Sequence, residues 1–460
     1  MINSLGLSIL LLAFFASVSF NGFFRSIAKK NNFLIDIPDK SRKFHFRATP
    51  LTGGLGIFFG ILISGVLING LTDANYSLDF SNKGFFENSQ FQERPVSKNF
   101  EVNEKNYELS LNKTSNEKIS VKIKSDGSSF NSDVIDIIPI SDNKFKAILP
   151  SGDEKIYLVD SGDVIEISST NEAVDIYSPK NNDNINLDNF TISLYICALF
   201  IMIFMVFDDY LSIKAIYRLF FQLFISALMI AMSGEYLSNL GNLFGTGQIN
   251  LGILSIPFTI FCVVGIMNAF NMIDGLNGIC ASLALIPIIF VAFLGNFSFG
   301  LLIPIGAILG FLAYNLGYLG KKRRVFLGDS GSNMLGFAVA FICIEYSQNI
   351  NHLSYINPVT ALWLVCIPLV DSIAVMFTRA VSGIMPFRPG REHLHHRLLN
   401  LGIKPKRILF IFIFSSSFFA LVGFTIEYFY PNKEYLSFYT FLILSVSYYL
   451  ISIKNIKQNV

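Results

Sequence analysis

Three oxygen-bearing side chains, Asn268, Asn271 and Asp274, follow an apolar run at residues 251–267. In a helix, at about 100° per residue, they would lie within an arc of about 120° on one face. Polar groups at a membrane helix end usually face a protein interior or a wet cavity, because lipid exposure is costly. Carboxylate and amide oxygens suit a hard cation or a phosphate-bearing ligand. The alternative is a polar helix end at the membrane surface, turning at the glycines that follow.

Two further acidic motifs also adjoin apolar runs. Asp208 and Asp209 are adjacent at the end of the run at 190–207. Such carboxylates can accept a proton or attract a cation, although a solvated helix end has the same composition. Asp329 stands among small residues where the run at 331–347 begins, and a helix start favours an anion. The simpler interpretation is an ordinary helix N-cap by Asp329 or Ser330.

A cationic cluster follows the run at 357–377 and comprises Arg391, His393, His395, His396 and Arg397. Its charges and hydrogen-bond donors suit a diphosphate. The His-x-His-His spacing also fits zinc, but neither a cysteine nor a second histidine pair at helical spacing accompanies it, so zinc is the minor alternative. Together, the acidic and cationic motifs indicate phosphoryl transfer.

Magnesium is the natural cation for such chemistry. It prefers few protein oxygens and keeps water and substrate phosphates as its other ligands. It would stabilise charge on a transferred diphosphate and its leaving group. Another carboxylate, Asp371, lies near the inner end of its run, and we expect it to pair with Arg379 rather than line the same cavity.

The composition predicts an all-α polytopic membrane protein. Of 460 residues, 52% are apolar and only 15% are charged, which is too apolar for a soluble chain of this size. The five cysteines lie in apolar runs without zinc spacing, so we expect core residues rather than disulfides. Eleven runs are long enough to suggest transmembrane helices, at 5–24, 51–71, 190–207, 217–233, 251–271, 279–295, 298–316, 331–347, 357–377, 407–428 and 436–453.

The distribution of basic residues predicts the orientation. With the N-terminus outside, the inward segments hold 22 Lys and Arg, whereas the short outward loops hold only Lys433. Short cytoplasmic loops carry such an excess of positive charge, and long translocated domains are exempt from the rule. All the polar motifs then fall on the cytoplasmic side.

Residues 72–190 differ from the rest of the chain. They hold 12 Lys and Arg against 21 Asp and Glu, whereas the remainder holds 23 against 12. Period-two alternation separated by turn signals predicts a small antiparallel β domain; the alternative is a disordered loop, particularly over 72–112. The alternating segments are 119–124, 144–149, 155–159 and 164–168. The predicted organisation is 1–71 with two helices, 72–190 as an extracytoplasmic acidic insert, and 191–460 with nine helices and the active site.

The ordered set of motifs resembles the polyprenyl-phosphate N-acetylhexosamine-1-phosphate transferases, glycosyltransferase family 4. The branch it resembles most is the bacterial undecaprenyl-phosphate N-acetylglucosamine-1-phosphate transferases. The likeness covers nearly all of the chain outside 72–190. The matching residues are Gly53-Gly54, Asp208-Asp209, Asn268-x-x-Asn271-x-x-Asp274-Gly275, Phe326-Leu-Gly-Asp329-Ser-Gly-Ser332 and His393-x-His395-His396.

The resemblance implies an enzyme of the bacterial inner membrane with a cytoplasmic active site. It would transfer N-acetylhexosamine-1-phosphate from a UDP-sugar to undecaprenyl phosphate, releasing UMP and starting a lipid-linked cell-surface glycan. Asp329 and Asn271 are implied as Mg²⁺ ligands, with Mn²⁺ as the alternative cation. The implied partners are the two substrates and the lipid bilayer; a homodimer is left open, and no nucleic acid is expected.

The resemblance also assigns the remaining motif residues. Asp208 would position the lipid phosphate with support from Asp209, and Lys214 matches a position near that phosphate. Asp274, grouped with the catalytic carboxylates, would help Asn268 bind the nucleotide diphosphate. Contacts to the donor are implied for the loop residues Arg391, His393, His395 and His396.

Two departures from the family pattern stand out. Asn277 is substrate-binding by its place in the motif, but many bacterial members carry Asp there; an amide still binds a phosphate or a metal-bound water. The insert at 72–190 exceeds the usual outer loop, and we expect an interaction or assembly domain. The rival interpretation is a secondary transporter for an anionic or sugar substrate, which predicts binding groups near the bilayer midplane and internal repeats.

Overall fold

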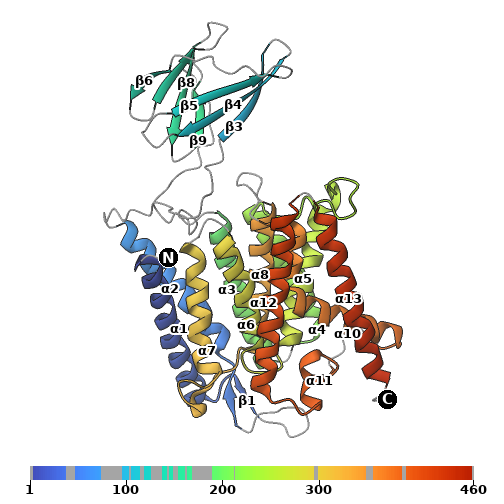
Figure 1. Cartoon of the computed structure of the whole chain (residues 1–460). Coiled ribbons are helices and arrows are strands. Elements are labelled where there is room, and N and C mark those ends of the chain that lie inside the picture. The colour runs from blue at the N-terminus through green and yellow to red at the C-terminus, as the bar shows by residue number, and fades with distance from the viewer. Residues whose placement is uncertain are drawn as a thin grey trace. The chain divides into compact units, whose positions relative to one another are not determined.

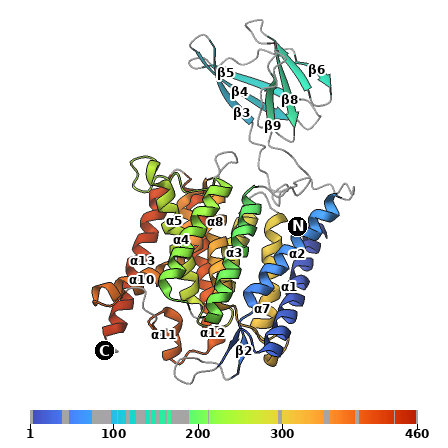
Figure 2. The same cartoon turned by 180° about the vertical axis from the view of Figure 1, so that it is seen from behind.

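A computed structural model describes residues 4–37, 47–73, 189–211, 213–294, 299–348, 356–385, 390–431 and 433–457, and seven strands within 96–167. The chain separates into two compact units, each described here by itself. One unit is Met1–Leu78 with Asn184–Val460, and the other is Asp79–Asp183. The first is a helical bundle, shown from two sides in Figures 1 and 2.

Apart from α11, the bundle's helices coincide with the eleven expected apolar runs, the run at 357–377 being divided between two helices. The bounds are α1 Ser4–Asn31, α2 Gly53–Asp73, α3 Asn189–Leu211, α4 Ala215–Ser233, α5 Ser255–Ile273, α6 Ile279–Leu294, α7 Phe299–Asn315, α8 Gly328–Gln348, α9 Pro358–Leu364, α10 Cys366–Val381, α11 Leu394–Asn400, α12 Pro405–Phe429 and α13 Glu434–Lys457. Helices α9 and α12 begin with proline, which lacks the N–H that a first helical turn cannot pair.

Helix α8 lies at the centre of the bundle. It contacts α2, α3, α5, α6 and α9, and most of its side chains are buried. Its close approach to α5 depends on Gly336, where a Cβ atom would come within 2.9 Å of the Met267 Cα atom. Its middle, residues 334–344, holds no charged residue, as expected for a helix surrounded by others, and the helix carries Asp329 at its first turn.

Helices α9 and α10 meet at a sharp bend of 81° at Val365. Pro368 lies in the first turn of α10, where its missing N–H does not interrupt the helix. The segment that the sequence predicted as one continuous helix is therefore a bent pair. Helix α11 is short and lies at the end of the bundle where β1 and β2 lie (Figures 1 and 2).

By length and composition, six helices among the described residues can cross a membrane, or seven if the bent pair counts as one span. Three shorter apolar helices, Gly53–Ile68, Ile279–Phe293 and Gly300–Asn315, add to them. The chain is thus a polytopic membrane protein built from helices, as predicted, and the count of eleven crossings stays a prediction. The five cysteines are free thiols, four of them buried, as expected for core residues.

Strands pair in both units. In the bundle, β1 Ile35–Asp36 and β2 Thr49–Pro50 pair antiparallel. In the smaller unit, two antiparallel sheets have the strand orders β3-β4-β5 and β6-β7-β8-β9. Their bounds are β3 Val96–Val102, β4 Lys105–Lys113, β5 Ile119–Ser125, β6 Ile137–Ser141, β7 Lys144–Ile148, β8 Glu154–Asp160 and β9 Asp163–Ile167. Residues 74–95 and 168–188, part of the predicted insert, lie outside the described residues.

Candidate active site

A carboxylate from α3 caps the first turn of α8. Asp209 Oδ1 accepts a hydrogen bond from the backbone N–H of Asp329 at 3.2 Å, and Oδ2 accepts one from Ser330 N–H at 3.4 Å. Carboxylates are favourable here because the first N–H groups of a helix lack intrahelical partners. The cap that the sequence suggested for Asp329 or Ser330 is therefore supplied by Asp209.

Arg218 joins two of the predicted carboxylates. Its Nη1 atom lies 3.2 Å from Asp208 Oδ2 and 3.1 Å from Asp329 Oδ2. The other oxygen of Asp208 accepts the Ile213 N–H at 2.9 Å. In the sequence, Arg218 is one of the 22 inward basic residues and carries no other signal by itself. Its place one turn after Lys214, beside an Asp-Asp pair, was the signal that could have identified it.

The carboxylates repel one another across the helix ends. Burial raises the pKa of Asp274 to about 8, and the charges of Asp329 and Asp209 add to the shift. Asp274 stands directly after α5. Asn271, one turn earlier, accepts a hydrogen bond from Ser332 Oγ at 3.0 Å. The structure therefore brings the end of α3, the end of α5 and the start of α8 together, as the motif positions predicted.

Asn268 belongs to a buried polar network beneath Asp329. Its Nδ2 atom donates to Gln222 Oε1 at 2.9 Å, and Gln222 Nε2 donates to Asn333 Oδ1 at 2.7 Å. Asn333 in turn donates to the backbone oxygen of Asp329 at 2.8 Å. Buried polar groups of this kind need partners, and a satisfied network fixes the packing. The network ties α4, α5 and α8 together; a contact of Asn268 with a nucleotide stays a prediction.

Asp371 holds the start of the histidine loop. Its Oδ2 atom lies 2.8 Å from His393 Nδ1, and its Oδ1 atom accepts the backbone N–H of Leu394 at 3.0 Å. Tyr448, from α13, donates its hydroxyl to the same Oδ1 atom at 2.6 Å. Asp371 and His393 are 2% and 4% exposed, so the pair is buried. The sequence indicated His393 but gave no role to Tyr448.

Arg379 pairs with Glu392 in the same loop. Its Nη2 atom lies 2.6 Å from Glu392 Oε2. The pairing of Asp371 with Arg379 that the sequence suggested is thus wrong, because each residue has a different partner, Asp371 with His393 and Arg379 with Glu392. The loop is attached to α10 at both points.

His395 connects the histidine loop to the turn after α5. It is 1% exposed, and its ring lies where a Cβ atom on Gly275 would be. Among the described residues, neither of its ring nitrogens has a hydrogen-bond partner. Burial lowers the pKa of His395 to about 3, with a smaller contribution from His396, so the ring is neutral near pH 7. A buried, neutral and unpaired imidazole can bind a ligand that completes its hydrogen bonds.

The remaining predicted residues are His396, Lys214, Arg391 and Asn277. His396 stacks obliquely on His395, with ring centroids 4.1 Å apart, and burial lowers its pKa. Lys214 is exposed just before α4, Arg391 is exposed at the start of the loop, and Asn277 is half-buried in the turn after Asp274. The structure records no side-chain contact of Lys214 or Asn277 with the carboxylates among the described residues.

The Gly53-Gly54 motif packs α2 against α8. The Gly53 and Gly54 N–H groups donate to the Phe326 and Leu327 oxygens at 2.9 and 3.1 Å. A Cβ atom on Gly54 would come within 2.6 Å of Gly331, so only glycine fits there. Close helix packing is therefore the role that the structure shows for this motif.

The donor set fits a magnesium ion that takes few protein ligands. Asp208, Asp209, Asp274 and Asp329 lie near a single guanidinium, and burial together with their mutual repulsion raises the pKa of Asp274, so an added cation would be favourable here. No group of three His, Cys, Asp or Glu side chains among the described residues could by itself hold a metal. Mg²⁺ commonly uses one or two carboxylates together with substrate phosphates and water, and Asp329 with Asn271 would supply protein oxygens of the right type.

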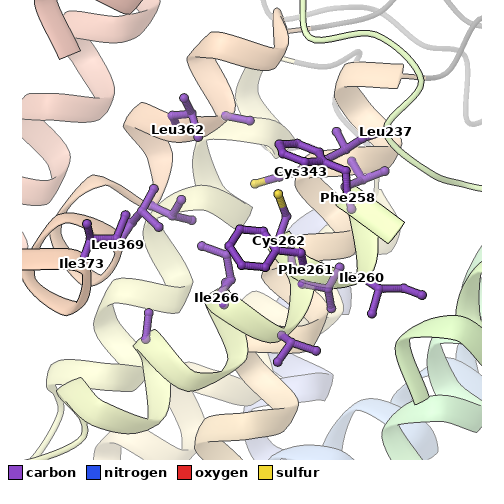
Figure 3. Close-up of a pocket in the computed structure, with 18 of the residues that line it drawn as sticks. Leu237, Phe258, Ile260, Phe261, Cys262, Ile266, Cys343, Leu362, Leu369 and Ile373 are labelled. Atoms are coloured by element: carbon purple, nitrogen blue, oxygen red, sulfur yellow. The ribbon is translucent and has the colours of Figure 1, made fainter. Parts of the chain in front are cut away.

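An apolar pocket of about 620 Å³ begins beside Asn268 and continues along α5. It is bordered by α5, α8 and the bent pair α9–α10. Figure 3 shows Phe261 and Ile266 of α5, with Leu369 and Ile373 of α10, among the side chains that line it. Pockets of this size with mostly apolar walls and a few polar groups typically bind small ligands.

Comparison with known proteins gives the family. Residues 191–347 match the family model "Glycosyl transferase family 4". The chain is also similar to proteins named undecaprenyl-phosphate alpha-N-acetylglucosaminyl 1-phosphate transferase. With the one from Escherichia coli O157:H7 it is 34% identical over 264 residues, 56% of this chain and 71% of the relative. This chain belongs to glycosyl transferase family 4.

Two more relatives carry the same name. The Escherichia coli K12 protein is 35% identical over 259 residues, 55% of this chain and 70% of its own length. The Haemophilus influenzae protein is 35% identical over 268 residues, 55% of this chain and 73% of its own length. The family membership predicted from the motifs is thus confirmed, and the chain is a membrane-embedded member of this transferase family.

Proposed function

We propose that this chain transfers N-acetylhexosamine-1-phosphate from a UDP-sugar to undecaprenyl phosphate and releases UMP. The observation that supports this most is the convergence of four carboxyl groups, Asp208, Asp209, Asp274 and Asp329, with Arg218 bridging Asp208 and Asp329. The relatives are named for the same lipid phosphate and for N-acetylglucosaminyl 1-phosphate transfer. The product would start a lipid-linked cell-surface glycan.

The reaction is a single displacement at phosphorus. An oxygen of the lipid phosphate attacks the phosphorus that bears the sugar, and a new P–O bond forms. The phosphoanhydride bond to the uridylate breaks, and UMP leaves with the bonding electrons. Little proton transfer is needed, so positioning and charge stabilisation supply most of the catalysis.

Each group around the site has a task in this proposal. Asp208, supported by Asp209, positions the lipid phosphate by way of Arg218, and Lys214 adds a cation beside it. Asp274, Asn268 and Asn277 border the nucleotide diphosphate. The loop residues Arg391, His393, His395 and His396 contact the donor. His395, with two unpaired ring nitrogens among the described residues, can donate and accept one hydrogen bond each.

A divalent cation would complete the charge balance. Asp329 and Asn271 would hold Mg²⁺, or Mn²⁺ in its place, and the ion would neutralise charge on the diphosphate. Arg218 already engages Asp329 in the structure. The protein's part is to keep that carboxylate at the start of α8, where Asn333 secures the backbone.

The apolar pocket is the proposed seat of the prenyl chain. It adjoins Asn268 and Met272 at the carboxylate end of α5 and is lined by apolar side chains from there on. An apolar lining suits the first units of a polyprenyl tail, whose phosphate would stay at the carboxylate cluster.

The proposed membrane arrangement has eleven crossings, with the N-terminus and residues 72–190 outside the bacterial inner membrane. The insert would serve as an interaction or assembly domain. Protease treatment of spheroplasts should cleave the insert and spare the histidine loop. Cleavage of that loop in intact spheroplasts would contradict the orientation. A homodimer, which the sequence left open, is tested by the protein mass in detergent.

The deciding experiment follows label from donor to lipid. Purified protein, undecaprenyl phosphate, Mg²⁺ and radiolabelled UDP-N-acetylglucosamine should give labelled lipid and one UMP per lipid. Chelation by EDTA should stop transfer and fresh Mg²⁺ should restore it. Asp329→Ala should abolish the product, whereas Tyr449→Phe, far from the carboxylates in sequence and contacting Phe377, should retain it.

Other outcomes of the same assay are informative. Product only with UDP-N-acetylgalactosamine would keep the reaction and change the donor. Failure with every UDP-N-acetylhexosamine would contradict the proposal and favour the transporter. The positions of the carboxylates argue against that rival, because they stand at helix ends rather than at the bilayer midplane where transporters bind.

A further inference from the structure

The carboxylate of Asp371 is shared by three elements that are far apart in sequence. It belongs to α10, it bonds to His393 Nδ1 at 2.8 Å and the Leu394 N–H at 3.0 Å at the start of α11, and it accepts the Tyr448 hydroxyl of α13 at 2.6 Å. Oδ2 serves the histidine, and Oδ1 serves the other two donors. The orientation of the His393 ring therefore depends on how firmly this carboxylate is held.

We propose that Tyr448 is a positioning residue of the transferase. Through Asp371, its hydroxyl fixes the ring of His393 for the nucleotide-sugar donor. This inference rests on the proposed function, in which His393 contacts that donor.

Hydrogen-bond chemistry explains why one hydroxyl matters. Asp371 is almost fully buried, and a buried carboxylate is stable only when several donors satisfy its oxygens. Hydrogen bonds to an ionised acceptor are about twice as strong as neutral ones. Without the Tyr448 hydroxyl, Oδ1 keeps one recorded donor, the Leu394 N–H. The carboxylate can then rotate toward it and draw His393 Nδ1 out of line.

The direction of the histidine follows from the same contact. With Nδ1 bound to Asp371, the other ring nitrogen, Nε2, is the atom that remains for a substrate phosphate. His393 and His395 lie with nearly parallel rings, 6° apart in plane and 6.1 Å between centroids. A shift of the His393 ring would therefore disturb the neighbouring His395 ring, which lies against the turn at Gly275.

Helix α13 also provides a matched control. The neighbouring Tyr449 points to a different contact, where its ring meets Phe377 edge-on at 5.1 Å. Tyr448→Phe and Tyr449→Phe each remove one hydroxyl from adjacent positions of the same helix. Only the first removes a donor to Asp371.

The test compares these two variants by steady-state kinetics in detergent. We expect Tyr448→Phe to lower kcat/KM for the UDP-sugar about tenfold, mainly through KM for the donor, with KM for undecaprenyl phosphate unchanged. Tyr449→Phe should stay within twofold of wild type. Binding of the UDP-sugar in the absence of lipid acceptor should weaken by the same factor as KM.

A double-mutant cycle with His393→Gln distinguishes positioning from general destabilisation. If Tyr448 acts through His393, Tyr448→Phe should change kcat/KM less than twofold in the His393→Gln background. The full tenfold loss in both backgrounds, or a loss of active protein with unchanged donor KM, would overturn the inference. An active Tyr448→Phe variant whose kcat/KM for the UDP-sugar is unchanged would also overturn the inference. A wild-type chain that neither binds nor converts any UDP-sugar would instead contradict the proposed function itself.

Discussion

The Nη1 atom of Arg218 lies 3.1 Å from Asp329 Oδ2 and is shared with Asp208 at 3.2 Å. One guanidinium, from the first turn of α4, therefore links the end of α3 to the first turn of α8. The Arg218 side chain is about one-third exposed, so it can exchange partners when a charged substrate arrives. In the proposed function, Asp208 positions the lipid phosphate and Asp329 holds the metal.

Replacing Arg218 tests this arrangement through the metal. In Arg218→Gln, we expect kcat to fall at least tenfold, because nothing would neutralise Asp208 beside the lipid phosphate. We also expect half-saturation at a lower Mg²⁺ concentration, because the arginine no longer competes for Asp329. Initial rates over a Mg²⁺ titration measure both quantities.

The matched variant is Arg218→Lys, which keeps one positive charge without the planar fork. It should retain more activity than Arg218→Gln and a Mg²⁺ dependence nearer to wild type. A Mg²⁺ requirement that rises when the arginine is removed would contradict competition between the arginine and the metal.

Gly275 tests the junction between the α5 turn and the histidine loop. A methyl group there would overlap the ring of His395, which is 1% exposed. We expect Gly275→Ala to reduce transfer by two orders of magnitude or more, since misplacement by about 1 Å can cost that much. Product formation by the purified variant measures the effect.

The control for that steric argument is Gly265→Ala, within α5, the helix that precedes the turn. A Cβ atom at Gly265 meets nothing within 4 Å, and alanine is the better helix former by about 1 kcal/mol. It should fold at least as stably as wild type and remain active. Equal activity of the two alanine variants would show that the His395 contact is dispensable.

Much of the site could be predicted from the sequence because its motifs follow apolar runs on one side of the membrane. Asp208, Asn271 and Asp329 come from three separate helices, and only the topology indicated that they meet. Arg218 was missed because an arginine near an apolar helix end is what the positive-inside rule already predicts.

Tyr448 and Gln222 show a second limit. Both lie within long apolar helices, where tyrosine is a common membrane-interface residue and a glutamine gives no periodic signal. Their importance comes from a partner more than 45 residues away, Asp371 for Tyr448 and Asn333 for Gln222. The 81° bend between α9 and α10 was likewise hidden, because both halves are equally apolar.

Filling the apolar pocket should act on the lipid acceptor alone. Gly265 lines the pocket with open space beside it, so Gly265→Leu would place a side chain where the prenyl chain is proposed to lie. We expect KM for undecaprenyl phosphate to rise about tenfold, with KM for the UDP-sugar unchanged. Kinetics with each substrate varied in turn, beside Gly265→Ala, make the comparison. A change confined to KM for the UDP-sugar would contradict the placement of the prenyl chain in this pocket.

The buried His395 should make folding stability depend on pH. Its pKa is lowered to about 3 in the folded chain by burial, against about 6.5 when unfolded. Between these values the unfolded chain binds the proton and the folded chain does not, so stability is complete above pH 6.5 and falls as the pH drops toward 3. Linkage gives a loss of up to about 1.4 kcal/mol per pH unit from this group. Lowering the pH from 7 to 5 should therefore reduce the free energy of unfolding, measured in detergent, more in wild type than in His395→Asn. The asparagine side chain cannot take up the proton. Equal pH dependence in the two proteins would mean that the imidazole is protonated within the fold.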